Sequence, residues 1–166
     1  MRQVNDQMGI ICYTFHYLVG TKERHAVSSE QTGFTYDNLR RVKKGVELFN
    51  KDEYWDCHEE LEHWWLEDLH DPARLIYWAI IQVAACLYHY ERDNLIGCKG
   101  MIVKTWNKLE RAEQAYVENE LTEKYLDWTH FKKLCRAVPD EPALEDFKPL
   151  FDYNFPDPAN WELPNE

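Results

Sequence analysis

The sequence has no C-x-x-C pair among its five cysteines and no apolar run long enough to cross a bilayer. An odd cysteine count without metal-ligand spacing favours neither a disulfide framework nor a zinc ribbon, so we expect reduced thiols and a cytoplasmic location. The longest apolar run near the start, residues 10–19, is far shorter than the ~20 residues of a membrane helix. We therefore expect a soluble protein that does not associate with membranes.

Basic residues are scarce as well. Lys and Arg number 19 against 30 Asp and Glu, which gives a net charge of −11. Nucleic acids and anionic membranes are bound through basic patches, and the densest basic runs here, residues 40–44 and 132–133, fit solvated helix faces. We expect no nucleic-acid partner. The sequence also lacks a P-loop, a G-x-G-x-x-G loop and a Ser or Cys nucleophile motif.

What the sequence does contain is helical periodicity from about Tyr36 onward. It predicts an all-α fold, a compact bundle of about four to five helices. Asp52, Asp71 and Asn94 are the expected N-caps of the second, third and fourth helices. The expected helices span about residues 36–49, 53–69, 72–92, 95–118 and 128–137.

The third of these helices is apolar nearly all round, so we expect it to be central in the bundle or to face a partner chain. We divide the chain into an N-terminal extension (1–33), a helical bundle (34–138) and a C-terminal tail (139–166). The tail holds six of the seven prolines together with several aromatics. We expect it to lie extended across the bundle or across a neighbouring subunit.

The second helix places a histidine and a carboxylate in the middle of its own apolar face. On a wheel of about 100° per residue, His58 and Glu62 lie at its centre, whereas Glu60 and His63 point the opposite way. Glu59 lies near the edge. The apolar members of this stripe are Tyr54, Leu61, Trp65 and Leu69.

A buried carboxylate needs partners, and His58 is the nearest by spacing to Glu62. Gln82 and His89 share one face of the third helix and would meet the same stripe. We call these four residues the polar cluster, with Trp65 and Trp78 as its walls. If Glu62 and His58 are paired in the core, Glu62→Ala should lower the free energy of unfolding by roughly 2–4 kcal/mol.

The polar cluster has two interpretations. It is either a buried hydrogen-bond network that fixes helix register without chemistry, which we favour, or a site for a metal ion or small ligand. Two known metal-binding patterns do not fit the sequence. A zincin needs H-E-x-x-H, and the fifth position here is Glu62. A di-iron bundle needs E-x-x-H on two helices, and only Glu60 with His63 has that spacing.

These motifs together resemble the domain-of-unknown-function family numbered 309 over roughly residues 38–115. The segments that carry the resemblance are Gly45-x-x-Leu48-Phe49-Asn50-x-x-x-Tyr54, His58-Glu59-x-Leu61-Glu62-x-x-Trp65, Ile80-Ile81-Gln82-Val83-Ala84-Ala85 with His89, and Arg92-Asp93-Asn94-x-x-Gly97. The resemblance implies a compact helical bundle, a cytoplasmic prokaryotic protein and no established activity. The family's recurrent polar positions correspond to His58, Glu59, Glu62, Gln82, His89 and Asn94. Cys57 departs from the alanine that the family more often has there.

The sequence therefore favours a non-enzymatic binding or self-associating domain, either a homodimer or a domain with a protein partner. No cofactor is predicted. The ligand-site residues would be the polar cluster with Trp65 and Asn94. The alternative is a metal- or ligand-dependent enzyme of hydrolase type, with Glu59 or Glu62 as the catalytic carboxylate. A divalent metal, if present, would be held by His58, Glu62 and His89.

Overall fold

The computed structural model of the chain describes residues 33–164. These residues form helices and no strand, so the predicted all-α bundle is confirmed. The predicted N-terminal extension, apart from its last residue, lies outside the described residues. The helices are α2 (Tyr36–Phe49), α3 (Tyr54–Glu67), α4 (Arg74–Tyr90), α5 (Leu95–Gln114), α6 (Glu120–Leu126), α7 (Trp128–Ala137) and α8 (Lys148–Phe151), with the short 3₁₀ helices η2 (Leu144–Phe147) and η3 (Pro158–Asn160).

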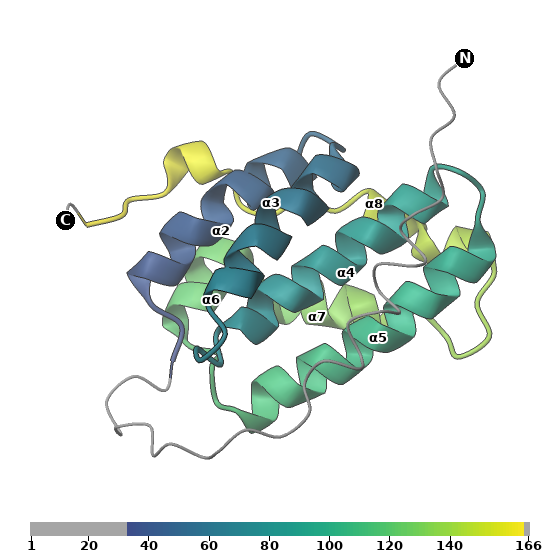
Figure 1. Ribbon diagram of the computed structural model, residues 1–166. Coiled ribbons are helices and arrows are strands. Elements are labelled where there is room, and N and C mark those ends of the chain that lie inside the picture. Colours follow the sequence, from purple (N-terminus) through teal and green to yellow (C-terminus); the bar gives the residue numbers. More distant parts are fainter. Residues whose placement is uncertain (1–32, 165–166) are drawn as a thin grey trace. The chain divides into compact units, whose positions relative to one another are not determined.

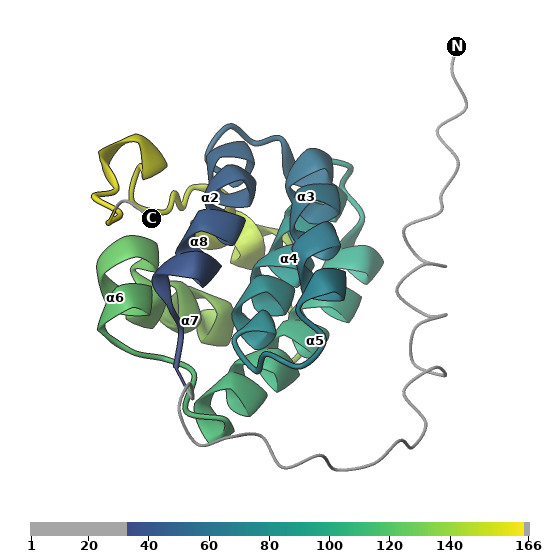
Figure 2. The ribbon, with the colours of Figure 1, turned by 60° about the vertical axis from the view of Figure 1, so that its left-hand side comes forward.

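Helix α4 is the centre of the bundle. It packs against α3 on one side and α5 on the other, and α2 packs against α3 (Figures 1 and 2). The segment η2 contacts both α4 and α5. Because α4 is enclosed by elements of its own chain, its nearly uniform apolar surface is accounted for without a partner.

Two of the three predicted caps differ from the structure. Asn94 caps α5, where its Oδ1 accepts from Gly97 N at 3.0 Å, as expected. Asp52 does not cap α3: its φ of 61° turns its carboxylate toward Tyr54, whose hydroxyl donates to it at 3.0 Å. Asp71 instead accepts from the backbone N–H of Ala73 at 2.8 Å, within a turn that precedes α4.

The region after α5 differs from the prediction in a second way. Helix α5 ends at Gln114, and Tyr116, with a φ of 54°, departs from the helical backbone before Glu118. The sequence reasoning missed α6, a helix of 7 residues that Asn119 caps by accepting from the backbone N–H of Leu121 at 3.0 Å. Asp127, with a φ of 45°, separates α6 from α7.

The C-terminal segment, residues 139–164, lies on helices of its own chain and contains η2, α8 and η3. Asn50, at the end of α2, holds it through two hydrogen bonds of 2.9 Å to the backbone N–H and carbonyl of Phe155. The Phe155 ring lies between Phe49 and Phe131, with centroids 5.0 and 5.1 Å away. The apolar side chains that this segment buries include Phe147, Leu150, Tyr153, Phe155 and Trp161.

Among residues 33–164, no helix is long and apolar enough to cross a membrane.

Candidate functional site

Two pairs of aromatic rings set the register between α3 and α4. Trp55 contacts Tyr88 with ring centroids 5.6 Å apart, and Trp65 contacts Trp78 with centroids 4.7 Å apart. Each pair lies ten residues from the other on both helices, so α3 and α4 run antiparallel in contact. We call the stretch between the ring pairs the α3–α4 seam, and Gln82 and the predicted polar residues of α3 fall within it.

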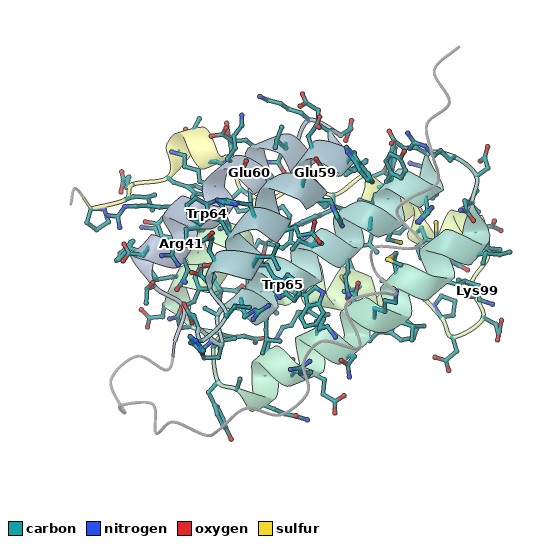
Figure 3. All side chains as sticks on the ribbon, in the orientation of Figure 1. Arg41, Glu59, Glu60, Trp64, Trp65 and Lys99 are labelled. Carbon is teal, nitrogen blue, oxygen red and sulfur yellow. The ribbon has the colours of Figure 1, made fainter. Side chains whose placement is uncertain are left out.

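The α3 stripe is largely as predicted. Tyr54, Leu61 and Trp65 are buried. Trp65 lies on the α4 side of the helix, whereas Glu59 and Glu60 lie on its other side (Figure 3). Leu69 is the exception, 59 % exposed, because α3 ends two residues before it.

His58 is buried in the seam, with 4 % of its surface exposed. Its ring stacks on Trp55 with centroids 5.7 Å apart and an interplanar angle of 14°. Its Nδ1 is buried and has no hydrogen-bond partner within the part of the chain that the structure describes. Burial lowers the pKa of His58, so the ring is neutral at pH 7.

Glu62 is half-buried in the same seam and is not paired with His58. Within the described residues it makes no hydrogen bond and no ion pair. The His58 ring instead stacks on Trp55, one turn earlier in α3. Burial, and secondly the charge of Glu59, raise the pKa of Glu62.

Gln82 is the third polar residue of the seam, with 4 % of its surface exposed. Its Oε1 is buried, and no described residue forms a hydrogen bond with it. The expected network, in which each polar group satisfies another, is therefore not formed by His58, Glu62 and Gln82. An unpaired buried polar group costs about 1–3 kcal/mol, so this arrangement disfavours a purely stabilising role for the seam.

His89 lies at the corner between α4 and α5 and is held by Asn94. The Asn94 Oδ1 accepts from Gly97 N, which leaves its Nδ2 to donate to His89 Nδ1 at 3.1 Å. His89 Nδ1 is therefore an acceptor, and the ring proton is on Nε2. A Cβ atom on Gly97 would lie 2.4 Å from His89 Cγ, so this position needs glycine.

No group of three or more His, Cys, Asp or Glu side chains in residues 33–164 is placed to hold a metal ion. The conditional metal set of His58, Glu62 and His89 is thus not preassembled in the described part of the chain. Glu59, the candidate base, is exposed. Binding of a divalent metal stays the untested alternative to the prediction that the protein has no cofactor.

A cluster of cations around Trp65 and Trp78 was missed by the sequence reasoning. The Arg74 guanidinium lies 4.3 Å from the Trp65 ring centroid, and Lys108 Nζ lies 3.9 Å from that of Trp78. Lys108 has 5 % of its surface exposed. The available signal was its spacing, since it lies three and four residues from Thr105 and Ala112 in the buried stripe of α5.

A Glu62 paired with His58 would make its replacement destabilising, whereas the unpaired Glu62 of this structure makes its replacement stabilising. We expect Glu62→Gln to raise the free energy of unfolding at pH 7 by about 1 kcal/mol, because a half-buried carboxylate without a partner is removed. A raised native pKa stabilises the fold below the ordinary glutamate pKa of about 4.3, and this contribution is lost as pH rises through the native value. The difference between variant and wild type in urea unfolding should therefore shrink toward pH 4. A less stable variant at pH 7 would show that Glu62 has a partner in solution.

These features define a class: an all-α bundle domain whose central helix meets its neighbour along a seam of unpaired polar groups. Residues 42–101, from α2 into α5, match the family described as "Domain of unknown function (DUF309)". The resemblance predicted from the sequence is thereby confirmed over this stretch, which includes the whole polar cluster.

The chain is also similar to the "Uncharacterized protein YpuF" of Bacillus subtilis (strain 168), with 35 % identity over 74 residues. The similarity covers 45 % of this chain and 42 % of that protein, so the chain spans less than half of the relative's length. No solved structure matches the chain.

Proposed function

We propose that this chain is a non-enzymatic binding domain that takes a small polar ligand at the α3–α4 seam. The observation that carries the proposal is a pair of buried atoms, His58 Nδ1 and Gln82 Oε1, that have no hydrogen-bond partner among residues 33–164. They come from two helices that face each other across the seam. A ligand that formed hydrogen bonds with both atoms would offset the free-energy cost of burying them unpaired.

The chemistry of the seam favours a ligand with N–H donors. Gln82 Oε1 and the Glu62 carboxylate are acceptors, and neutral His58 can accept at Nδ1. A cationic group beside Glu62 would also oppose the effect of burial, which raises the pKa of that carboxyl. We therefore propose an amine or ammonium group as the part of the ligand held here.

Self-association is less well supported than a ligand. The sequence favoured a homodimer or protein partner because of the apolar third helix and the aromatic tail. Contacts within the chain account for the burial of α4 and of the tail aromatics. A dimer in native mass spectrometry would favour self-association, and a bound Zn, Fe or Mn ion would favour the enzyme alternative.

Methylammonium chloride is a suitable probe of the proposed ammonium site. Tetramethylammonium chloride is the control, because it carries the same charge but has no N–H donor. We expect methylammonium to shift the Gln82 side-chain amide and the His58 ring signals saturably in NMR spectra, and tetramethylammonium not to do so. Gln82→Leu should abolish the response and raise the free energy of unfolding by about 1 kcal/mol, since an unpaired amide is replaced by an apolar group of similar size.

Equal shifts with both probes would indicate a charge effect and contradict the hydrogen-bonding site. A destabilised Gln82→Leu variant would show that Gln82 is already paired within the free protein, and the proposal would fail.

A further inference from the structure

Cations gather at one place in this acidic chain. Arg74, at the start of α4, and Lys108 and Arg111, on α5, surround the contacting rings of Trp65 and Trp78. The net charge of the whole chain is −11, so acidic side chains are plentiful as potential partners. Whether each of these cations is paired with an acidic side chain therefore indicates whether the cluster is structural or could bind an anion.

Lys108 is buried without a carboxylate beside it. Its Nζ donates to the uncharged Asn107 Oδ1 at 3.1 Å, and it takes part in no ion pair among the described residues. The pKa of Lys108 is lowered to about 8, mainly by burial and further by the charges of Arg111 and Lys104. Lys132 shows the usual solution in this fold, since it has ion pairs of 2.9 Å with Glu113 and 2.5 Å with Glu118.

Arg74 is also incompletely satisfied. Its Nη1 donates to the Leu69 carbonyl at 3.2 Å, but its buried Nε has no hydrogen-bond partner among the described residues. Among residues 33–164, Asp68 is the acid whose charge acts on Arg74, and its Oδ1 forms an ion pair with Arg41. The charge of Arg111 opposes that of Arg74. Arg111 thus lies close enough to repel both Arg74 and Lys108.

We propose that Arg74, Lys108 and Arg111 bind a phosphate-type oxyanion beside the Trp65–Trp78 ring pair. A doubly charged anion would offset the mutual repulsion and would give the free Arg74 Nε an acceptor. Arg111 is exposed and Trp78 is partly exposed, so the site opens to solvent there. This proposal does not depend on the ammonium site of the seam, which Glu62 and Gln82 place about one helical turn away.

The competing explanation is that the two tryptophan faces stabilise the cations by cation–π contact alone. A titration of the full chain with sodium phosphate, at ionic strength held constant with sodium chloride, separates the two. The readouts are calorimetry and the indole N–H signals of Trp65 and Trp78, assigned through Trp→Phe variants. Phenyl phosphate in place of inorganic phosphate shows whether the site takes a phosphate group carried by a larger molecule.

We expect saturable phosphate binding that shifts both indole signals, and a loss of at least tenfold in affinity for Lys108→Met. The matched control is Lys99→Met, which removes the same charge from the same helix. Lys99 lies away from Trp65 (Figure 3) and pairs with Glu141 at 2.5 Å. This control should leave the affinity unchanged. Arg111→Met, at an exposed position, tests the site without disturbing the core and should weaken binding several-fold.

If phenyl phosphate binds more tightly than inorganic phosphate, the site takes the phosphate group of a larger ligand. If the two bind equally, the site takes free phosphate. Indole signals that do not respond to phosphate would overturn the proposal. So would an equal loss of affinity in Lys99→Met and Lys108→Met, because the effect would then follow net charge.

Discussion

Phe155→Ala should lower the free energy of unfolding by about 3–4 kcal/mol, because a large buried ring is removed and its cavity is left behind. The ring is 3 % exposed and contacts Phe49 of α2 and Phe131 of α7, so it joins two helices that are distant in sequence. Urea unfolding followed by far-UV circular dichroism measures the change. Because a typical domain has a free energy of unfolding of only about 5–15 kcal/mol, the loss of this one ring should remove a large part of the stability.

Ile96→Ala is the control for Phe155→Ala, since Ile96 is 85 % exposed on α5. A substitution there should change stability by less than about 0.5 kcal/mol. If Phe155→Ala were equally mild, the C-terminal segment would not be docked on the bundle in solution.

Gly97→Ala should destabilise the protein by about 2 kcal/mol, although alanine is the better helix former. The new Cβ would lie 2.4 Å from Cγ of His89 and 2.6 Å from its Cδ2 and Nδ1. The ring would have to move, which breaks its hydrogen bond to Asn94. Overpacking of about 1–3 kcal/mol and a lost hydrogen bond of about 1 kcal/mol outweigh a propensity gain of about 1 kcal/mol.

Gly100→Ala provides a matched comparison on the same helix with the opposite sign. Nothing lies within 4 Å of the Cβ that alanine would add at Gly100. We expect a gain of about 0.5–1 kcal/mol from helix propensity alone. Thermal unfolding of the two variants side by side tests the close α4–α5 approach. A stabilised Gly97→Ala would show that His89 does not occupy that space.

The helices were predictable because their signals are local. The 3-4-3 spacing of Leu39, Val42, Val46 and Phe49 alone indicates α2, and all four are buried. Helix α6 was missed because 7 residues carry too little periodicity. The turns at Asp52 and Tyr116 depend on positive φ values. The residue type at these positions does not by itself specify a positive φ.

The candidate site was predictable as a location but not as a set of contacts. Wheel geometry correctly buried His58, and Trp78 of the Gln82 face contacts Trp65 of the α3 stripe, whereas Cys86 and His89 of that face contact α5. It could not show that the His58 ring stacks on Trp55 and leaves Glu62 unpaired, because that depends on a side-chain rotamer. The ring pair of Trp65 and Trp78 was expected as a wall, and its contacts with Arg74 and Lys108 depend on how α3, α4 and α5 pack together.

The two hydrogen bonds between Asn50 and Phe155 close a loop of 105 residues, and this has a consequence for biosynthesis. Contacts of such large sequence separation form late, after local helices, because their closure entropy must be offset by other contacts first. A nascent chain that has released α2 to α7 from the ribosome still exposes Phe49 and Phe131. Until the segment around Phe155 emerges, that apolar surface is open to chaperones and to other unfinished chains.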